Sequence, residues 1–464
     1  MEALVRFALL LAALTAAVFA QALPVPQKEA FNIPVEYYKL PNGLRVVLSQ
    51  DHTAPTVTVA VYYHIGFRIE PKDRTGFAHL FEHMMFQGSQ NLGKMEFVKL
   101  VQQNGGVLNG STRFDFTNYF EIVPSNKLET MLWAEADRMH GLAVNQDNLT
   151  NQQGVVSNEV KVNVLNRPYG GFPWLDMPQY ANVNWYNAHN FYGDLHDIEA
   201  ATLQDVQAFF KEYYAPNNAA LVVVGDFDAA QAKQFVEKYF AAIPASKRPP
   251  MPDISEPRQT EEKKANKIDP QAKRPAIAFA YHMPDRNTPE YYAMGVLDQI
   301  LLQGDDSLLH QKLVKELGYT GEVEGGINLL GNMYNYDGPM LWMVNMYHDQ
   351  NVTPDQIMQA SDSVIEEVRS KPLDQATVDR ALVKLRSSFY SDIEGLFGFG
   401  RADMLACFAL FDDDPARING TEAQFEKITP QTIQKTAQEY LRPTNRTVLT
   451  VSTKSESGNA KQGQ

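Results

Sequence analysis

The sequence predicts an α+β protein made of two homologous α/β domains joined by a linker. Three observations support this fold class: each half opens with strand-like segments followed by a helical one, each half closes on the same succession of elements, and a proline-rich, charged segment lies between them. With 464 residues, of which 44% are hydrophobic, the chain is long enough to bury more than one core.

The first domain is expected to span residues 31–243. Its opening strands are predicted at Leu44–Leu48 and Val57–Tyr63, where β-branched and other apolar residues cluster. The stretch from Gly76 to Phe86 that follows is predicted to be a helix.

The second domain is expected to span residues 275–453 and to repeat this order. It opens with a predicted strand at Ala276–Tyr281 and a predicted helix at Pro289–Leu302. Both halves close with a helix, a turn containing proline and asparagine, and an apolar strand, which is Leu221–Val224 in the first half and Val448–Val451 in the second. The two halves therefore look like copies of one plan.

The linker is expected to cover residues 244–274. It begins with the proline-rich segment Pro244–Pro250 and continues into the charged run Glu261–Lys264, a composition poor in large apolar residues. The last residues, 454–464, are expected to form a disordered tail.

The first 22 residues match the pattern of a secretory signal peptide. Arg6 precedes the apolar run Phe7–Phe19, and Ala20-Gln21-Ala22 offers small residues for cleavage after Ala20 or Ala22. The alternative is an uncleaved anchor, but the run is shorter than the roughly 20 residues that a spanning helix needs. We therefore expect a secreted or periplasmic protein with no stable membrane span.

Charge and cysteine content exclude several classes of site. The formal net charge of −14 argues against a nucleic-acid partner, because phosphate binding needs a basic face. The single cysteine, Cys407, excludes an internal disulfide and a cysteine-rich metal site, and its apolar surroundings predict a buried helix. Any metal must be held by His, Asp or Glu.

A candidate metal site lies in the predicted helix at His79-Leu80-Phe81-Glu82-His83. His79 and His83 share one helix face and can bind one ion, while Glu82 lies beside them as a base that can deprotonate water. This order of residues is the inverzincin pattern. The alternative, two surface histidines that bind nothing, is disfavoured because apolar residues surround the motif.

A catalytic zinc needs a third protein ligand. Glu159, in a second predicted helix, is the best candidate, but periodicity alone does not choose it over Asp137, Glu135 or Glu121. The second half offers no equivalent site. If Gln87-Gly88 is aligned with Gln303-Gly304, the three motif residues correspond to Gly295, Asp298 and Gln299.

Three segments together resemble the pitrilysin/insulinase family of zinc peptidases, specifically its two-domain subfamily that includes the β subunit of mitochondrial processing peptidase. They are Gly76–Ser89, Gly105–Thr112 and Gly154–Glu159. The resemblance implies two domains, each a mainly antiparallel sheet covered by helices, that form a clam-like chamber. It also implies one Zn²⁺ per chain.

The resemblance also implies roles for single residues. Glu159 follows His83 by 76 residues, about the distance at which family members carry the third zinc ligand. Many members place a supporting glutamate seven residues before that ligand, where this chain has Gln152. An amide can still hydrogen-bond a ligand, but it adds no negative charge.

The segment from Asn109 to Phe120 is similar to the edge strand on which the family binds substrate. Asn109, Gly110 and Ser111 would then contact an extended peptide by backbone hydrogen bonds, which tolerate many substrate sequences. The alternative interpretation is a plain core strand in which Asn109 and Asp115 have turn roles, and both interpretations can hold together.

One departure from the family concerns the second half, from which active members bring an Arg and a Tyr to the substrate. The preferred alignment places Val314 and Gly321 at these positions, and a shifted alignment offers Lys312 and Tyr319. Some relatives divide the work between two chains, so a homodimer or a heterodimer with a homologous chain is expected.

The expected function is that of a zinc-dependent endopeptidase that hydrolyses peptides or unfolded polypeptides with a water activated by the ion. Glu82 would be the catalytic base, and His79, His83 and Glu159 the metal ligands. Two alternatives stay open: a non-catalytic or partner-dependent subunit of a heterodimeric peptidase, and a maturation enzyme for one dedicated peptide.

Overall fold

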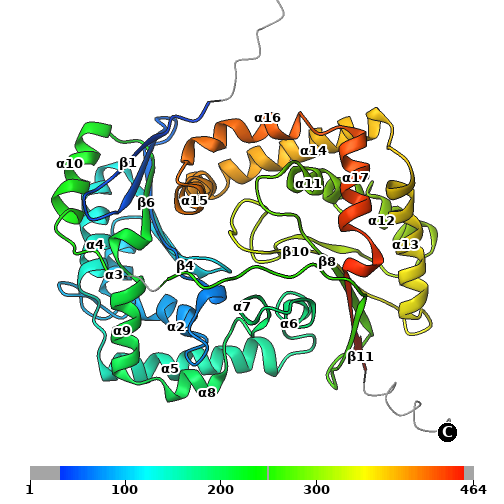
Figure 1. Cartoon of the computed structure of the whole chain (residues 1–464). Coiled ribbons are helices and arrows are strands. Elements are labelled where there is room, and N and C mark those ends of the chain that lie inside the picture. The colour runs from blue at the N-terminus through cyan, green and yellow to red at the C-terminus, as the bar shows by residue number, and fades with distance from the viewer. Residues whose placement is uncertain (1–31, 248–249, 454–464) are drawn as a thin grey trace, which may run out of the picture. The chain divides into compact units, whose positions relative to one another are not determined.

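The computed structural model describes residues 32–247 and 250–453, which form two β-sheets with their helices (Figure 1). The predicted signal peptide (1–22) and the predicted tail (454–464) lie outside the described residues. None of the helices in the described part of the chain is both long and apolar enough to cross a membrane. The predicted fold class is confirmed, because each half is a mainly antiparallel sheet with helices.

The first sheet has six strands in the order β1-β2-β6-β3-β5-β4, and only β2 and β6 run parallel. Its strands are β1 (Glu36–Lys39), β2 (Arg45–Gln50), β3 (Thr56–Tyr63), β4 (Val107–Thr112), β5 (Thr117–Pro124) and β6 (Ala219–Gly225).

The second sheet has five strands in the order β7-β11-β8-β10-β9, and only β7 and β11 run parallel. Its strands are β7 (Lys263–Ile268), β8 (Ala276–His282), β9 (Glu324–Ile327), β10 (Leu341–Tyr347) and β11 (Arg446–Ser452). This order repeats that of the first sheet without β1. The duplication inferred from the sequence therefore extends to strand pairing.

Strand β7 corrects the predicted linker, which was expected to continue to residue 274. Lys263–Ile268 instead pairs along β11, in the place that β2 takes beside β6. The strand was missed because its side chains alternate between half-buried and exposed positions and most of them are polar. A polar edge strand of this kind has the composition of a loop.

The helices of the first half lie between and after its strands. They are α2 (Phe77–Met84), α3 (Glu96–Gln103), α4 (Leu128–His140), α5 (Gln146–Val160), α6 (Asp176–Ala181), α7 (Trp185–Ala188), α8 (Leu195–Ala200), α9 (Leu203–Tyr213) and α10 (Ala229–Phe240). Those of the second half are α11 (Pro289–Leu301), α12 (Leu308–His310), α13 (Pro354–Ser370), α14 (Gln375–Glu394), α15 (Phe399–Cys407), α16 (Thr421–Phe425) and α17 (Pro430–Tyr440).

One face of the first sheet packs on helices of its own half. Val59, Val61 and Tyr63 of β3 join a core that includes residues of α2, α4, α9 and α10. Helix α9 begins with a capping box, in which Thr202 and Asp205 each accept a backbone N–H from the other. Strand β3 and helix α2 confirm the strand predicted at Val57–Tyr63 and the helix predicted at Gly76–Phe86.

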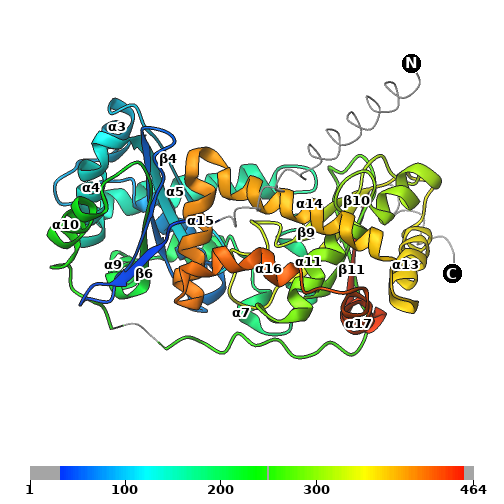
Figure 2. The ribbon, with the colours of Figure 1, turned by 90° about the horizontal axis from the view of Figure 1, so that it is seen from above.

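The other face of the first sheet is covered by a helix of the second half. Helix α15 contacts β3 and β6, as both views of the ribbon show (Figures 1 and 2). The hydroxyl of Tyr62 donates to Asp403 at 2.7 Å, and the rings of Phe120 and Phe399 stack at 3.8 Å. Cys407, at the end of α15, is buried as the sequence predicted.

The second sheet receives a reciprocal cover from the first half. Phe172, Met177 and Ala181, in and before α6, pack into a core formed by one face of the second sheet. The residues of β8 on that face are all alanines, at positions 276, 278 and 280. Small side chains leave room for α6 to approach the sheet closely.

A buried polar cluster joins the same two halves. The Arg68 side chain donates to Asp115 at 2.7 Å and to Asn187 at 2.5 Å. Asp115 also accepts the backbone N–H groups of Asp337 and Gly338, from the second half, at 2.7 and 3.3 Å. Arg68 and Asp115 are 1% and 2% exposed, so their charges depend on each other.

We predict that Arg68→Met destabilises the fold by about 3–5 kcal/mol, because it leaves the Asp115 carboxylate buried without its cation. Urea unfolding followed by circular dichroism measures this change. The matched control is Arg258→Met, which removes an exposed ion pair with Glu439 and should cost less than about 1 kcal/mol. Equal effects of the two variants would contradict the importance of the buried cluster.

Candidate metal centre

The candidate site is built on α2, whose first turn is held by a buried carboxylate. Glu70 is fully buried and accepts the backbone N–H groups of Gly76 and Ala78 at 2.9 and 2.5 Å. These are amides that a helix start leaves without partners, and a negative charge there also opposes the helix dipole. Gly76 takes a left-handed conformation, φ 80°, which suits a residue without a side chain.

His79, His83 and Glu159 come together as the sequence predicted. The Nε2 atom of His79 lies 3.6 Å from Glu159 Oε1, and that of His83 lies 3.2 Å from Glu159 Oε2. Ligands about 2.0–2.2 Å from one tetrahedral zinc stand about 3.4 Å apart, so the three side chains fit such an ion. Within the described residues they form the only group of His, Cys, Asp or Glu side chains close enough to hold a metal.

The electrostatics of the three side chains favour this arrangement. Burial, and then the nearby His83, lowers the pKa of His79 to about 4, so its imidazole stays neutral as a ligand requires. Burial would also lower the pKa of His83, but the hydrogen bond and charge of Glu159 outweigh it and raise that pKa. The hydrogen bond from His83 in turn lowers the pKa of Glu159.

Glu82 lies beside this group rather than within it. Its carboxylate accepts the Thr112 hydroxyl at 2.7 Å, which fixes the side chain against strand β4. Burial raises the pKa of Glu82 despite this hydrogen bond, and a carboxylate with a raised pKa is a better proton acceptor. The geometry therefore suits a general base next to a metal.

The other acids that the sequence offered as third ligand are engaged elsewhere. Glu121 and Glu135 both bind the buried guanidinium of Arg138. Asp137 accepts the Ser89 hydroxyl at 2.5 Å and the backbone N–H of Asn91 at 3.1 Å. Their positions agree with the choice of Glu159 that the family resemblance implied and that periodicity alone could not make.

Gln152 lies on the same face of helix α5 as Glu159. It is 4% exposed, and its side chain is one of the groups that raise the pKa of His83. Its Nε2 donates to the side chain of Asn151 at 2.8 Å. Gln152 is therefore close enough to His83 to orient that ring.

Strand β4, which carries Asn109, Gly110 and Ser111, is an outer strand of the first sheet. Strand alternation puts Gly110 and Thr112 on the face of Tyr119 and Tyr63, toward α2. No strand in the described residues pairs with the other side of β4, so Asn109–Thr112 lie in an edge strand. The prediction of one edge strand from Asn109 to Phe120 is wrong beyond Thr112, because residues 117–120 belong to β5, which lies between β3 and β4. The Ser111 hydroxyl donates a hydrogen bond to the side-chain oxygen of Asn118 at 2.5 Å.

Sequence reasoning missed two side chains at the centre. Thr112 ends the segment Gly105–Thr112, but nothing in its spacing indicates the contact with Glu82. Tyr192 lies in a turn far along the chain, and its ring stands edge-on to that of His79 with 5.2 Å between centroids. No periodic pattern could have found it.

The corresponding helix of the second half, α11, uses the same positions for structure. Asp298, aligned with Glu82, is buried and accepts Trp342 Nε1 at 2.7 Å. Gly295, aligned with His79, faces Met333 and Phe425, which a larger side chain would displace. The second copy has replaced a metal site with core packing.

The second-half positions aligned with the family's Arg and Tyr lie in or after a π-helix, η5 (Gln311–Glu316). Lys312 and Val314 are within it, and Tyr319 and Gly321 follow it. Lys312 of this element forms an ion pair with Glu316 at 2.5 Å. Tyr319 is half-buried, and its backbone N–H donates to Leu313 O at 2.9 Å. Within the described residues, no hydrogen bond or ion pair of Lys312 or Tyr319 reaches α2.

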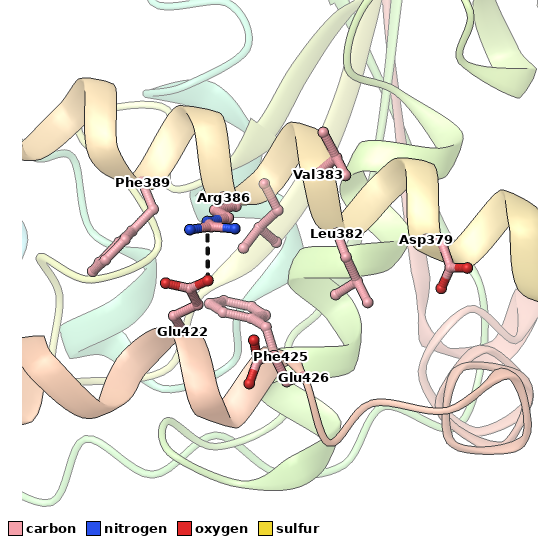
Figure 3. A pocket seen from close by; sticks show the side chains of 9 residues that line it. Asp379, Leu382, Val383, Arg386, Phe389, Glu422, Phe425 and Glu426 are labelled. Atoms are coloured by element: carbon pink, nitrogen blue, oxygen red, sulfur yellow. Dashed lines mark ion pairs between the residues drawn. The ribbon is translucent and has the colours of Figure 1, made fainter. Parts of the chain in front are cut away.

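A separate apolar pocket lies between α14 and α16 (Figure 3). The Arg386 side chain bridges it with an ion pair to Glu422 at 3.0 Å. Phe389, Leu382 and Phe425 line its apolar part. It contains none of the residues predicted from the sequence, so it is not part of the candidate centre.

The sequence matches two family descriptions in order. Residues 45–168 match "Insulinase (Peptidase family M16)", and residues 200–385 match "Peptidase M16 inactive domain". The first match contains the whole candidate centre except Tyr192. The chain therefore belongs to peptidase family M16, the insulinase family.

Individual relatives agree with this assignment. The zinc protease PqqE of Helicobacter pylori is 26% identical over 421 residues, which cover 89% of this chain and 92% of that protein. A protease from Helicobacter pylori, known as a crystal structure, has a TM-score of 0.83 at 25% identity and covers 90% of this chain and 100% of its own. A probable mitochondrial-processing peptidase subunit beta from Arabidopsis thaliana is 24% identical over 44% of this chain and 38% of that protein.

We predict that Gln152→Ala weakens zinc binding about 10- to 100-fold, because it removes a side chain that orients His83. Glu159→Gln, which removes a carboxylate ligand, should weaken it further. Competition with a chromophoric chelator measures both affinities. Asn158→Ala, an exposed neighbour on α5, is the matched control and should bind zinc like the parent chain. Parent-like affinity of Glu159→Gln would contradict the ligand set.

Proposed function

We propose that this chain is a zinc-dependent endopeptidase that hydrolyses peptides or unfolded polypeptides. The observation that carries the proposal is the convergence of His79, His83 and Glu159 with Glu82 beside them. Membership of peptidase family M16 and the names of relatives as zinc proteases support it. The neutral imidazole of His79, the imidazole of His83 and the carboxylate of Glu159 suit one Zn²⁺ per chain.

A zinc ion held by these residues would polarise the substrate carbonyl and lower the pKa of a water molecule to about 7. Glu82 accepts the proton of that water as its oxygen attacks the carbonyl carbon. The same carboxyl group then delivers the proton to the leaving amine as the C–N bond breaks. Thr112 keeps Glu82 in position throughout, through its hydrogen bond.

Strand β4 is the proposed binding surface for the peptide backbone. A substrate that adds to its free edge would pair with the backbone at Asn109, Gly110 and Ser111. The strand then continues to Thr112, the partner of Glu82, so the bound peptide lies beside the base. Recognition through backbone groups explains a tolerance for many substrate sequences.

The alternative is a chain that works only with a homologous partner. Two observations favour it. Within the described residues, no hydrogen bond or ion pair of Lys312 or Tyr319 reaches α2, and residues 200–385 match a domain described as inactive. A similar relative carries the name of a subunit, mitochondrial-processing peptidase subunit beta. The partner would supply the substrate contacts that this second half lacks.

We also propose that the chain is exported to the periplasm or secreted. The support is the pattern of residues 1–22, with a charged start, an apolar run and small residues at the cleavage position. The mature chain would then begin shortly before the first described strand.

We predict that Glu82→Gln abolishes cleavage of a peptide library while one zinc stays bound, because the amide cannot accept the proton of the water. Mass spectrometry of the digest and metal analysis of the purified protein provide the two readouts. Glu96→Gln, an exposed-helix substitution on α3, controls for loss of a glutamate elsewhere. Cleavage by Glu82→Gln at the parent rate would refute the mechanism.

We predict that the mature protein is a dimer, either of itself or with a homologous chain. Light scattering after gel filtration of the protein, alone and mixed with a homologous chain encoded nearby, measures the mass of each species. Peptidase assays on the same fractions show which species is active. Full activity in a monomeric fraction would contradict the expected dimer.

A further inference from the structure

Tyr192 is an aromatic residue that contacts the candidate centre and that the proposed mechanism does not use. It lies in the turn between α7 and α8, and its ring stands edge-on to His79, with 5.2 Å between centroids and planes at 68°. The ring of Trp174 contacts it as well, at 5.7 Å. Tyr192 is thus packed against a predicted ligand, although it is distant from α2 in the sequence.

The turn that carries Tyr192 is built onto the start of α2. Gly193 approaches so closely that a Cβ there would lie 2.3 Å from Gly76 N, and a Cβ at Gly76 would lie 2.7 Å from Tyr192 O. The backbone N–H of Asp194 donates to the Thr75 hydroxyl at 2.8 Å. Because both glycines have positive φ, larger residues at either position would push this turn away from the helix.

The hydroxyl of Tyr192 is available for a ligand. The side chain is half-buried, and within the described residues its hydroxyl makes no hydrogen bond. The phenol therefore stands beside the predicted ligand His79, with no hydrogen-bond partner for its hydroxyl in the described part of the chain.

We propose that Tyr192 is a further catalytic residue, whose phenol donates a hydrogen bond to the carbonyl oxygen of the scissile peptide. This inference rests on the proposed peptidase function and adds a donor from the first half itself. A packing role would need only the ring, which phenylalanine provides equally well. A donor aimed at the oxygen that gains negative charge contributes about 10²–10³-fold to the rate in comparable sites.

The first test is the substitution Tyr192→Phe, which keeps the ring and removes the donor. We expect kcat for a fluorogenic peptide to fall about 100-fold or more while KM changes little, because the hydrogen bond strengthens only in the transition state. Tyr180→Phe, an exposed tyrosine on α6, is the matched control. A parent-like kcat for Tyr192→Phe would overturn the proposal.

The second test measures binding without turnover. A phosphinic peptide, whose tetrahedral anion resembles the transition state, should bind the zinc-loaded Tyr192→Phe variant more weakly by a factor similar to the loss in kcat. The spectrum of the cobalt-substituted protein should not change. A changed cobalt spectrum would identify Tyr192 as a metal ligand, and an unchanged phosphinic affinity would remove its role as a donor, so either result overturns the assignment.

The two proposals fail in different ways. If the parent chain cleaves peptides and Tyr192→Phe cleaves them equally well, only the role of Tyr192 is wrong. If the parent chain, tested alone and with its homologous partner, neither cleaves peptides nor binds the phosphinic peptide, the peptidase function is wrong and the role of Tyr192 falls with it.

Discussion

The structure depends on one constraint, which is that the central strands of both sheets are apolar on both faces. Every residue of β3 from Val57 to Tyr63 is buried, and β8 is buried from Ala276 to Tyr281. A single layer of helices covers only one face of such a sheet, so the other face needs a second cover to keep it from water. Helix α15 and the segment around α6 provide that cover, and each comes from the opposite half.

The reciprocal covering of the two sheets affects the candidate centre. Helix α2 lies on one face of the first sheet and α15 on the other, so residues of the second half support the sheet on which the centre is built. Glu82, the proposed base, contacts that sheet through its hydrogen bond with Thr112. The two halves are therefore not independent, although within the described residues only the first carries the proposed metal ligands.

The same plan serves two purposes in the two halves. In the first, α2 is short, begins at a glycine held by Glu70 and presents polar side chains toward α5. In the second, α11 is longer, is buried along most of its length and ties Asp298 to Trp342. Helix α11 packs into a core and has none of the three motif residues, which fits the description of its family match as an inactive domain.

The sequence by itself determined the features that depend on neighbours along the chain. The strands, the helix that carries His79, Glu82 and His83, and the duplicated order of elements follow from apolar periodicity, because such periodicity directly reflects which face of an element is buried. The spacing of four residues also fixed both histidines on one face of α2. Family resemblance added Glu159, which periodicity could not select.

Only the tertiary structure decided the contacts between distant segments. It engaged Glu121 and Glu135 with Arg138 and Asp137 with Ser89, paired Thr112 with Glu82, and brought Tyr192 to His79. The tertiary structure also pairs the polar segment 263–268 as a strand. It packs α6 of the first half on the second sheet and α15 of the second half on the first sheet. Each of these depends on how whole elements pack, and packing across long loops leaves no periodic signal in the residues concerned.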